Sequence, residues 1–238
     1  MTDAKSSRER VDAQGRAYAG SQQQIQLYAS RREPELTASV VTALSAAGAY
    51  AEGIRWISPT EANQFAEASD GAFLDALELS HLRPGLSSFW PQGGPHWDGL
   101  AILAPGPGAL LVEAKSYPEE MFGSGCQASP GSRTLIENSL AKAKTWAGAA
   151  EGADWLGPLY QYANRLAHVF FLREVGQVDA WLLNLCFVDD PHRPTSLQRW
   201  QQQLHLIKKQ LGFAGKRVPF AVDVFLSAHS RDELLGVV

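Results

Sequence analysis

The chain lacks the features that mark several common classes of protein. It has only two cysteines in 238 residues, Cys126 and Cys186, and neither lies in a spacing typical of a zinc knuckle or a disulfide framework. No apolar run approaches the ~18 residues of a membrane span, and the first residues, MTDAKSSRER, carry no apolar segment of a secretory signal. We therefore expect a soluble cytoplasmic protein without membrane contacts, and neither a zinc finger nor a secreted disulfide-rich domain.

Charge is also scarce. Charged residues make up 19% of the chain and the net charge is −4, which excludes proteins that coat nucleic acid through bulk positive charge. Residues 61–120 hold nine acidic residues against two basic ones. An acidic centre of this kind suits a cation site, and it equally suits an acidic surface loop.

Three nucleotide-binding or hydrolase motifs are missing as well. The sequence contains no GxxxxGK[ST] phosphate loop, no GxGxxG turn and no GxSxG elbow. Their absence argues against P-loop NTPases, dinucleotide-binding enzymes and α/β-hydrolases.

The remaining pattern alternates between helices and strands. Apolar residues are 45% of the chain, enough for a sizeable core. We predict helices over 34–47, from 59 onward, 72–81, 134–150, 158–175 and 197–211, strands over 54–57, 97–103, 109–115, 180–188 and 218–226, and loops over 83–96 and 118–133. Mixed elements of this kind predict an α/β domain with one central mixed sheet flanked by helices.

Residues 1–32 differ from the rest, being polar and rich in glutamine. Val11, Tyr18 and Ile25 recur every seven residues, which predicts a helical arm that packs on the body or joins two copies into a homodimer. A partly frayed arm is the alternative. We divide the chain into this arm, 1–32, and a main domain, 33–238.

The chemistry concentrates in one hairpin, residues 97–115. Side chains alternate along a strand, so Leu111, Glu113 and Lys115 share one face. If the turn is centred between Pro105 and Gly106, Asp98 lies opposite Glu113. Two facing carboxylates are unfavourable by up to ~1 kcal/mol on a wet sheet, and by more when partly buried, unless a cation bridges them or one is protonated. The alternative without a functional site is a surface ion pair between Glu113 and Lys115.

This arrangement resembles the PD-(D/E)XK nuclease superfamily, the restriction-endonuclease-like fold. The matching residues are Asp98, Glu113 and Lys115, with Trp97 in place of the usual proline before the aspartate. The resemblance implies a core of helix, three strands, helix and strand within residues 34–188. It also implies a Mg²⁺ site (Mn²⁺ as substitute) made by Asp98, Glu113 and the main-chain carbonyl of Ala114. For the acid that many members carry on the first helix, Glu35 is the leading candidate, ahead of Glu33, Glu52 and Glu67.

A second polar cluster lies on the helix predicted over 158–175. Gln161, Asn164, Arg165 and His168 form one stripe at helical spacing, which is either a solvent-exposed face or a phosphate-binding surface. Gln161 resembles the glutamine of the QxxxY pattern in some branches of the superfamily, although Arg165 stands where that pattern has tyrosine. If the stripe is a phosphate-binding surface, we expect Arg165 and Asn164 to bind substrate together with Tyr117.

The leading hypothesis is a metal-dependent phosphodiesterase acting on nucleic acid, with DNA favoured, in which Asp98, Glu113, Lys115 and Gln161 are catalytic. A nuclease-like binding subunit of a larger defence or repair assembly, without turnover, is the first alternative. In the second alternative the paired carboxylates have a purely structural role.

Overall fold

The computed structural model describes residues 10–237, and in these five strands form one mixed sheet. The order across the sheet is β1-β2-β3-β4-β5. The first three strands are antiparallel neighbours, whereas β4 runs parallel to β3, and β5 parallel to β4. Their bounds are β1 Gly53–Ser58, β2 Gly99–Ala104, β3 Gly108–Lys115, β4 Ala180–Val188 and β5 Ala221–Ser227.

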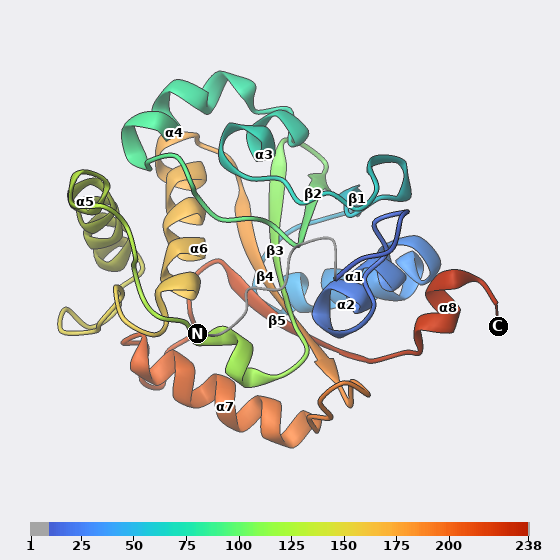
Figure 1. Ribbon diagram of the computed structural model, residues 1–238. Coiled ribbons are helices and arrows are strands. Elements are labelled where there is room, and N and C mark those ends of the chain that lie inside the picture. Colours follow the sequence, from blue (N-terminus) through green and yellow to red (C-terminus); the bar gives the residue numbers. More distant parts are fainter. Residues whose placement is uncertain (1–9, 238) are drawn as a thin grey trace.

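Helices cover both faces of this sheet (Figure 1), which confirms the predicted α/β class. Buried residues of α1, α2 and α8 join Leu110 and Val112 in one core cluster, whereas α3 to α7 pack with Leu111 in another. None of the helices between residues 10 and 237 combines the length and apolar character needed to cross a lipid bilayer. The α-helices are α1 Gly20–Arg31, α2 Glu33–Ala46, α3 Asp70–Ala76, α4 Arg83–Phe89, α5 Pro130–Trp146, α6 Tyr160–Phe170, α7 Leu197–Gln210 and α8 Arg231–Leu235.

The elements with the clearest periodicity lie where the sequence predicts them. β4 has the predicted bounds, and α7 begins at the predicted residue. On α7 the residues at alternating three- and four-residue spacing, Trp200, Leu204 and Ile207, are buried against the sheet. An apolar stripe along a helix must face the core, so the local sequence is enough to predict such a helix and its buried side.

Two predictions in the segment before β2 are wrong. The predicted loop 83–96 contains α4, because Pro84 occupies the first helical turn, where proline is tolerated, and Leu86 and Phe89 are buried. The helix predicted from residue 59 is only a 3₁₀ turn, Glu61–Asn63, which ends at two residues with positive φ, Gln64 and Phe65.

Three other predicted segments are subdivided. The helix predicted over 72–81 is split into α3 and a 3₁₀ turn, Ser80–Leu82, by the positive φ of Glu78. The helix over 158–175 continues beyond α6 as a π-helical turn, Phe171–Val175. The loop over 118–133 contains the 3₁₀ turn Pro118–Met121 and the start of α5.

The glutamine-rich segment packs on the body of the protein, and residues 1–9 of the predicted arm lie outside the described part. Ile25 and Tyr28 of α1 are buried in the same cluster as Leu110. The Gln26 side chain accepts from Ala17 N and donates to Gly15 O, so glutamines here satisfy main-chain groups rather than water.

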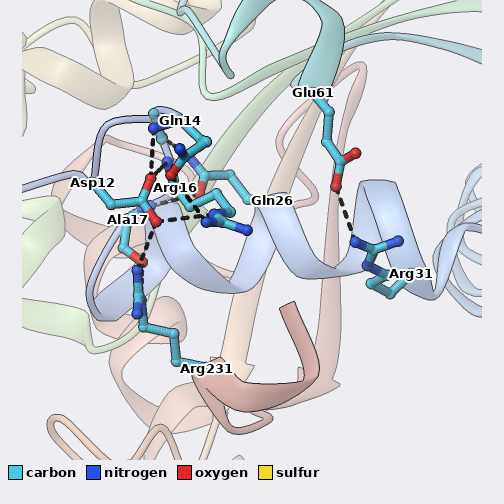
Figure 2. Close-up of polar contacts among 9 residues, drawn as sticks. Asp12, Gln14, Arg16, Ala17, Gln26, Arg31, Glu61 and Arg231 are labelled. Carbon is cyan, nitrogen blue, oxygen red and sulfur yellow. Dashed lines mark hydrogen bonds and ion pairs between the residues drawn. The ribbon is translucent and has the colours of Figure 1, made fainter. Parts of the chain in front are cut away.

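The turn before α1 is tied to the C-terminal helix through one carboxylate (Figure 2). Asp12 accepts from the Arg16 main chain and side chain and from the Arg231 guanidinium at 3.0 Å. Arg231 also donates to the Ala17 carbonyl at 3.1 Å. Residues near both ends of the described chain therefore form one polar cluster beside the sheet.

Candidate active site

The predicted hairpin register is confirmed. Gly99 pairs with Val112 and Leu100 with Leu111, which makes Asp98 and Glu113 the next facing positions outward. Asp98 itself precedes β2, and its Oδ2 accepts from Ala114 N at 2.7 Å. The carboxyl of Asp98 is thereby fixed at the open end of the β2–β3 pair.

Glu113 is buried and lies between two cations. Lys115 Nζ is 2.5 Å from its Oε1, and Arg165 Nε donates to its Oε2 at 2.6 Å. Only 8% of the Glu113 side chain is exposed. The alternative that Glu113 and Lys115 form a solvent-exposed surface ion pair is therefore excluded. Arg165 is itself held in place by the carbonyl of His96, at 3.0 Å.

The two facing carboxyls, Asp98 and Glu113, have pKa values shifted in opposite directions. Burial, followed by the nearby charge of Glu113, raises the pKa of Asp98 to about 7. Burial alone would also raise the pKa of Glu113, but Arg165 and Lys115 outweigh it and keep that pKa below its ordinary value. Glu113 and Asp98 in turn raise the pKa of Lys115 against the effect of its burial, so this amine stays cationic.

The third acid at the site is Glu67. Burial raises its pKa, and its charge interacts with His96, Glu113, Arg165 and Lys115. It reaches the site because an isolated bridge joins Ala68 to Trp97, with Trp97 N donating to Ala68 O at 3.0 Å.

The prediction that Glu35 supplies a third acid to this site is wrong. It lies on α2, whose buried residues pack on the opposite face of the sheet from Glu113. There it pairs with Arg32 at 2.9 Å. From the sequence alone Glu67 is only a weaker candidate, since no local pattern reveals which loop folds back onto Trp97.

The polar stripe of α6 is mostly buried and is not a solvent face. Gln161 is exposed, whereas Asn164, Arg165 and His168 are 6%, 8% and 1% exposed. His168 lies among aromatic rings, with the Trp90 centroid at 5.0 Å and the Trp97 centroid at 5.9 Å. The stripe points toward the β2–β3 hairpin, which is why Arg165 reaches Glu113.

Tyr117 is the predicted substrate-binding residue that the structure leaves apart from the acids. It follows β3, and the Arg193 guanidinium lies over its ring, 4.3 Å from the centroid. Its main-chain N–H, like that of Ser116, donates to Glu120. This arrangement gives Tyr117 a packing role at the end of β3.

Sequence reasoning missed a polar network beside Glu113. Asn184 is its register partner on β4, and Asn184 Nδ2 donates to both Tyr162 OH and Asp223 Oδ1 at 2.9 Å. Lys208 pairs with Asp223 in turn. The available signal was a polar residue within each of two apolar strands.

A void of about 10 Å³ lies between Glu113, Lys115, Arg165 and Asn184, close to the room that one water molecule needs.

The donors at this site suit a hard divalent cation. No group of three or more His, Cys, Asp and Glu side chains in residues 10–237 is arranged to hold a metal. Asp98 and Glu113 supply two carboxylates, and the Ala114 carbonyl points to the same side of β3 as the Ala114 N–H that Asp98 accepts. Each oxygen of Glu113 keeps a second lone pair besides its bond to a cation. Protein-bound Mg²⁺ typically has one or two carboxylate ligands, and water and substrate oxygens complete its coordination.

Comparison of the chain with protein-family models, with curated proteins and with solved structures finds no match.

Proposed function

We propose that this protein is a metal-dependent nuclease of the PD-(D/E)XK type that hydrolyses phosphodiester bonds in DNA. The observation that carries the proposal is the approach of Asp98, at the residue before β2, to Glu113 on β3, with Lys115 on the same face of β3 as Glu113. The strand order supports it too, because three antiparallel strands are followed by helices and then by a strand parallel to β3. That order is compatible with the core which the sequence resemblance implies, with α3 and α4 added between β1 and β2.

Asp98, Glu113 and the Ala114 carbonyl would hold Mg²⁺, or Mn²⁺ in its place. When bound, such an ion lowers the pKa of a water molecule and neutralises charge on the reacting phosphate. Three carboxyls, with Glu67, face two cations here. A further positive charge therefore improves the electrostatic balance of the site once Asp98 gives up its proton.

The basic residues of the site have separate roles. Lys115 stays cationic, so it stabilises developing negative charge and orients a water molecule, and it does not accept a proton. Arg165 carries a planar fork suited to a phosphate, and it reaches one by exchanging part of its contact with Glu113. Gln161, exposed one turn before Arg165, is placed to position the substrate.

Nicking of supercoiled plasmid DNA tests this proposal. The wild-type protein should nick it with Mg²⁺ or Mn²⁺ and stop when EDTA is added. Lys115→Ala and Asp98→Asn should each lower the rate by at least about a hundredfold, as the loss of a transition-state contact predicts. Lys142→Ala, an exposed lysine on α5, is the matched control and should keep the wild-type rate. Cleavage that survives both substitutions would refute the assignment.

A second candidate function, a nuclease-like binding subunit without turnover, is favoured by one observation. Both oxygens of Glu113 are already engaged by cations. Titration calorimetry with Mn²⁺ separates the two candidates. Saturable binding that Asp98→Asn abolishes supports the nuclease, whereas the absence of binding heat supports the silent subunit.

A further inference from the structure

A polar hollow opens beside Arg165, which we call the α6 groove. It has a volume of about 630 Å³, within the range of small-molecule and cofactor sites. Two loops, 91–96 and 123–129, form its sides together with the start of α5. Helix α6 contributes Tyr160, Gln161, Asn164 and Arg165. The residue that holds Glu113 thus also lines this groove.

The lining of the α6 groove carries almost no charge. Arg165 is its one permanently charged residue among those described, and the rest are mainly Gly, Pro, Ser, Gln and Ala. A surface that follows a duplex backbone neutralises several phosphates with Lys and Arg. The part of a ligand that enters this groove is therefore uncharged and polar, as a nucleobase is.

Asn164 provides the specific contact. The residue is 6% exposed, and its Oδ1 is shut off from solvent without a hydrogen-bond partner. Such an orphan acceptor is unfavourable in the free protein, and native proteins rarely keep one without a reason. A side-chain amide pairs with the donor and acceptor edge of a base, as Asn does with adenine. Tyr160, which lines the same groove, adds an aromatic ring of the kind on which bases stack.

The depth of the acids also limits what reaches them. Side-chain exposure is 8% at Glu113 and 15% at Lys115. A second hollow of about 520 Å³, lined by Arg10, Gln64 and Glu67, meets the α6 groove at His96, which lines both. An unpaired strand can bend along this path, whereas a base within a duplex must first leave its stack to enter such a recess.

We propose that the α6 groove receives the base of an unpaired nucleotide next to the reacting phosphate, so that the substrate is single-stranded DNA or an unpaired end or stretch of duplex DNA, such as negative supercoiling opens in a plasmid. This inference rests on the proposed nuclease function. It adds the substrate class and assigns Asn164 as the residue that contacts the base.

Fluorescence anisotropy tests the groove independently of cleavage. The probes are a short labelled single strand of mixed sequence and the blunt duplex of the same sequence, with EDTA present. The wild-type protein should bind the single strand at least about tenfold more tightly, the gain expected from one stacked base.

Two variants test whether the groove is responsible. Asn164→Leu removes the amide at similar volume, and it should weaken single-strand binding by about tenfold while the melting temperature stays the same or rises, since no hydrogen bond of Oδ1 is lost. Gly123→Trp should block the groove and cause a similar loss, because a Cβ there meets no atom within 4 Å and Gly123 lines the hollow. Gly152→Trp is the matched control: it is equally open, exposed and outside the groove, and should bind as wild type does.

The outcomes separate this inference from the nuclease assignment. Equal affinity for single strand and duplex, or wild-type affinity in Gly123→Trp, would overturn the groove proposal even if metal-dependent nicking persists. Preferential single-strand binding that Asn164→Leu and Gly123→Trp both weaken upholds base binding in the groove. If no metal-dependent cleavage is found as well, the nuclease assignment falls and the bound strand is a ligand and not a substrate.

Discussion

Arg165 Nε donates to Glu113 Oε2 across 2.6 Å, joining helix α6 to strand β3 of the β2–β3 hairpin. Both side chains are at least nine-tenths buried, at 10% and 8% exposure. Removing one member of such a pair leaves the other charge without compensation. Arg165→Ala should therefore lower the free energy of unfolding by about 3–5 kcal/mol, measured by urea denaturation.

An exposed pair serves as the control for this prediction. Arg133 and Glu137 form an ion pair one helical turn apart, with both side chains more than 40% exposed. Arg133→Ala should change the free energy of unfolding by at most about 1 kcal/mol, because solvent screens the interaction. Similar effects from both substitutions would show that burial does not govern the Glu113 pair.

Divalent cations should stabilise the folded protein. A ligand that binds only the folded state at about a hundred times its dissociation constant adds about 2.7 kcal/mol. For a chain of this size we expect Mn²⁺ to raise the melting temperature by about 5–10 °C, reversed by EDTA. Asp98→Asn should abolish the shift. An unchanged shift in that variant would place the ion elsewhere.

Glu67 should matter to the cation and Glu35 should not. Glu67 acts on Asp98 and Glu113 through its charge, whereas Glu35 lies on the opposite face of the sheet. We expect Glu67→Gln to weaken Mn²⁺ binding by about tenfold, as changes to the groups around metal ligands commonly do, and Glu35→Gln to have no effect. Titration calorimetry on both variants checks this, and equal affinities would remove Glu67 from the site.

His168 should make stability depend on pH. Burial lowers its pKa from 6.5 to about 4, with Arg165 acting in the same direction and the bond to the Asn164 carbonyl and the charge of Asp70 opposing. The unfolded imidazole therefore gains a proton at a higher pH than the folded one. The stability due to the neutral ring is fully present above pH 6.5 and is lost as the pH falls toward 4, by about 3 kcal/mol.

His168→Phe isolates this effect from that of the carboxyls. The difference in unfolding free energy between wild type and variant should shift by that amount between pH 7 and 4, since Asp98 and Glu67 titrate in both proteins. A difference that stays constant with pH would show that His168 is not buried as a neutral ring.

The sequence by itself determined the hairpin and its sidedness. Strand alternation is a local property, so the spacing of Glu113 and Lys115 alone puts them on one face. The facing position of Asp98 depends in addition on the hairpin register, which the sequence leaves as an assumption and the pairing of Gly99 with Val112 establishes. The amphipathic stripe of α7 and the apolar run of β4 were set in the same way.

The tertiary structure alone decided which other groups join them. Glu67 reaches the acids through a loop anchored by Ala68 and Trp97, a contact between segments about thirty residues apart that leaves no local periodicity. The stripe of α6 has the same spacing whether it faces water or the sheet, and only packing made Arg165 a partner of Glu113 and left Asn164 Oδ1 without one. Local patterns fix which side of an element is polar, and the packing of distant elements fixes what that side meets.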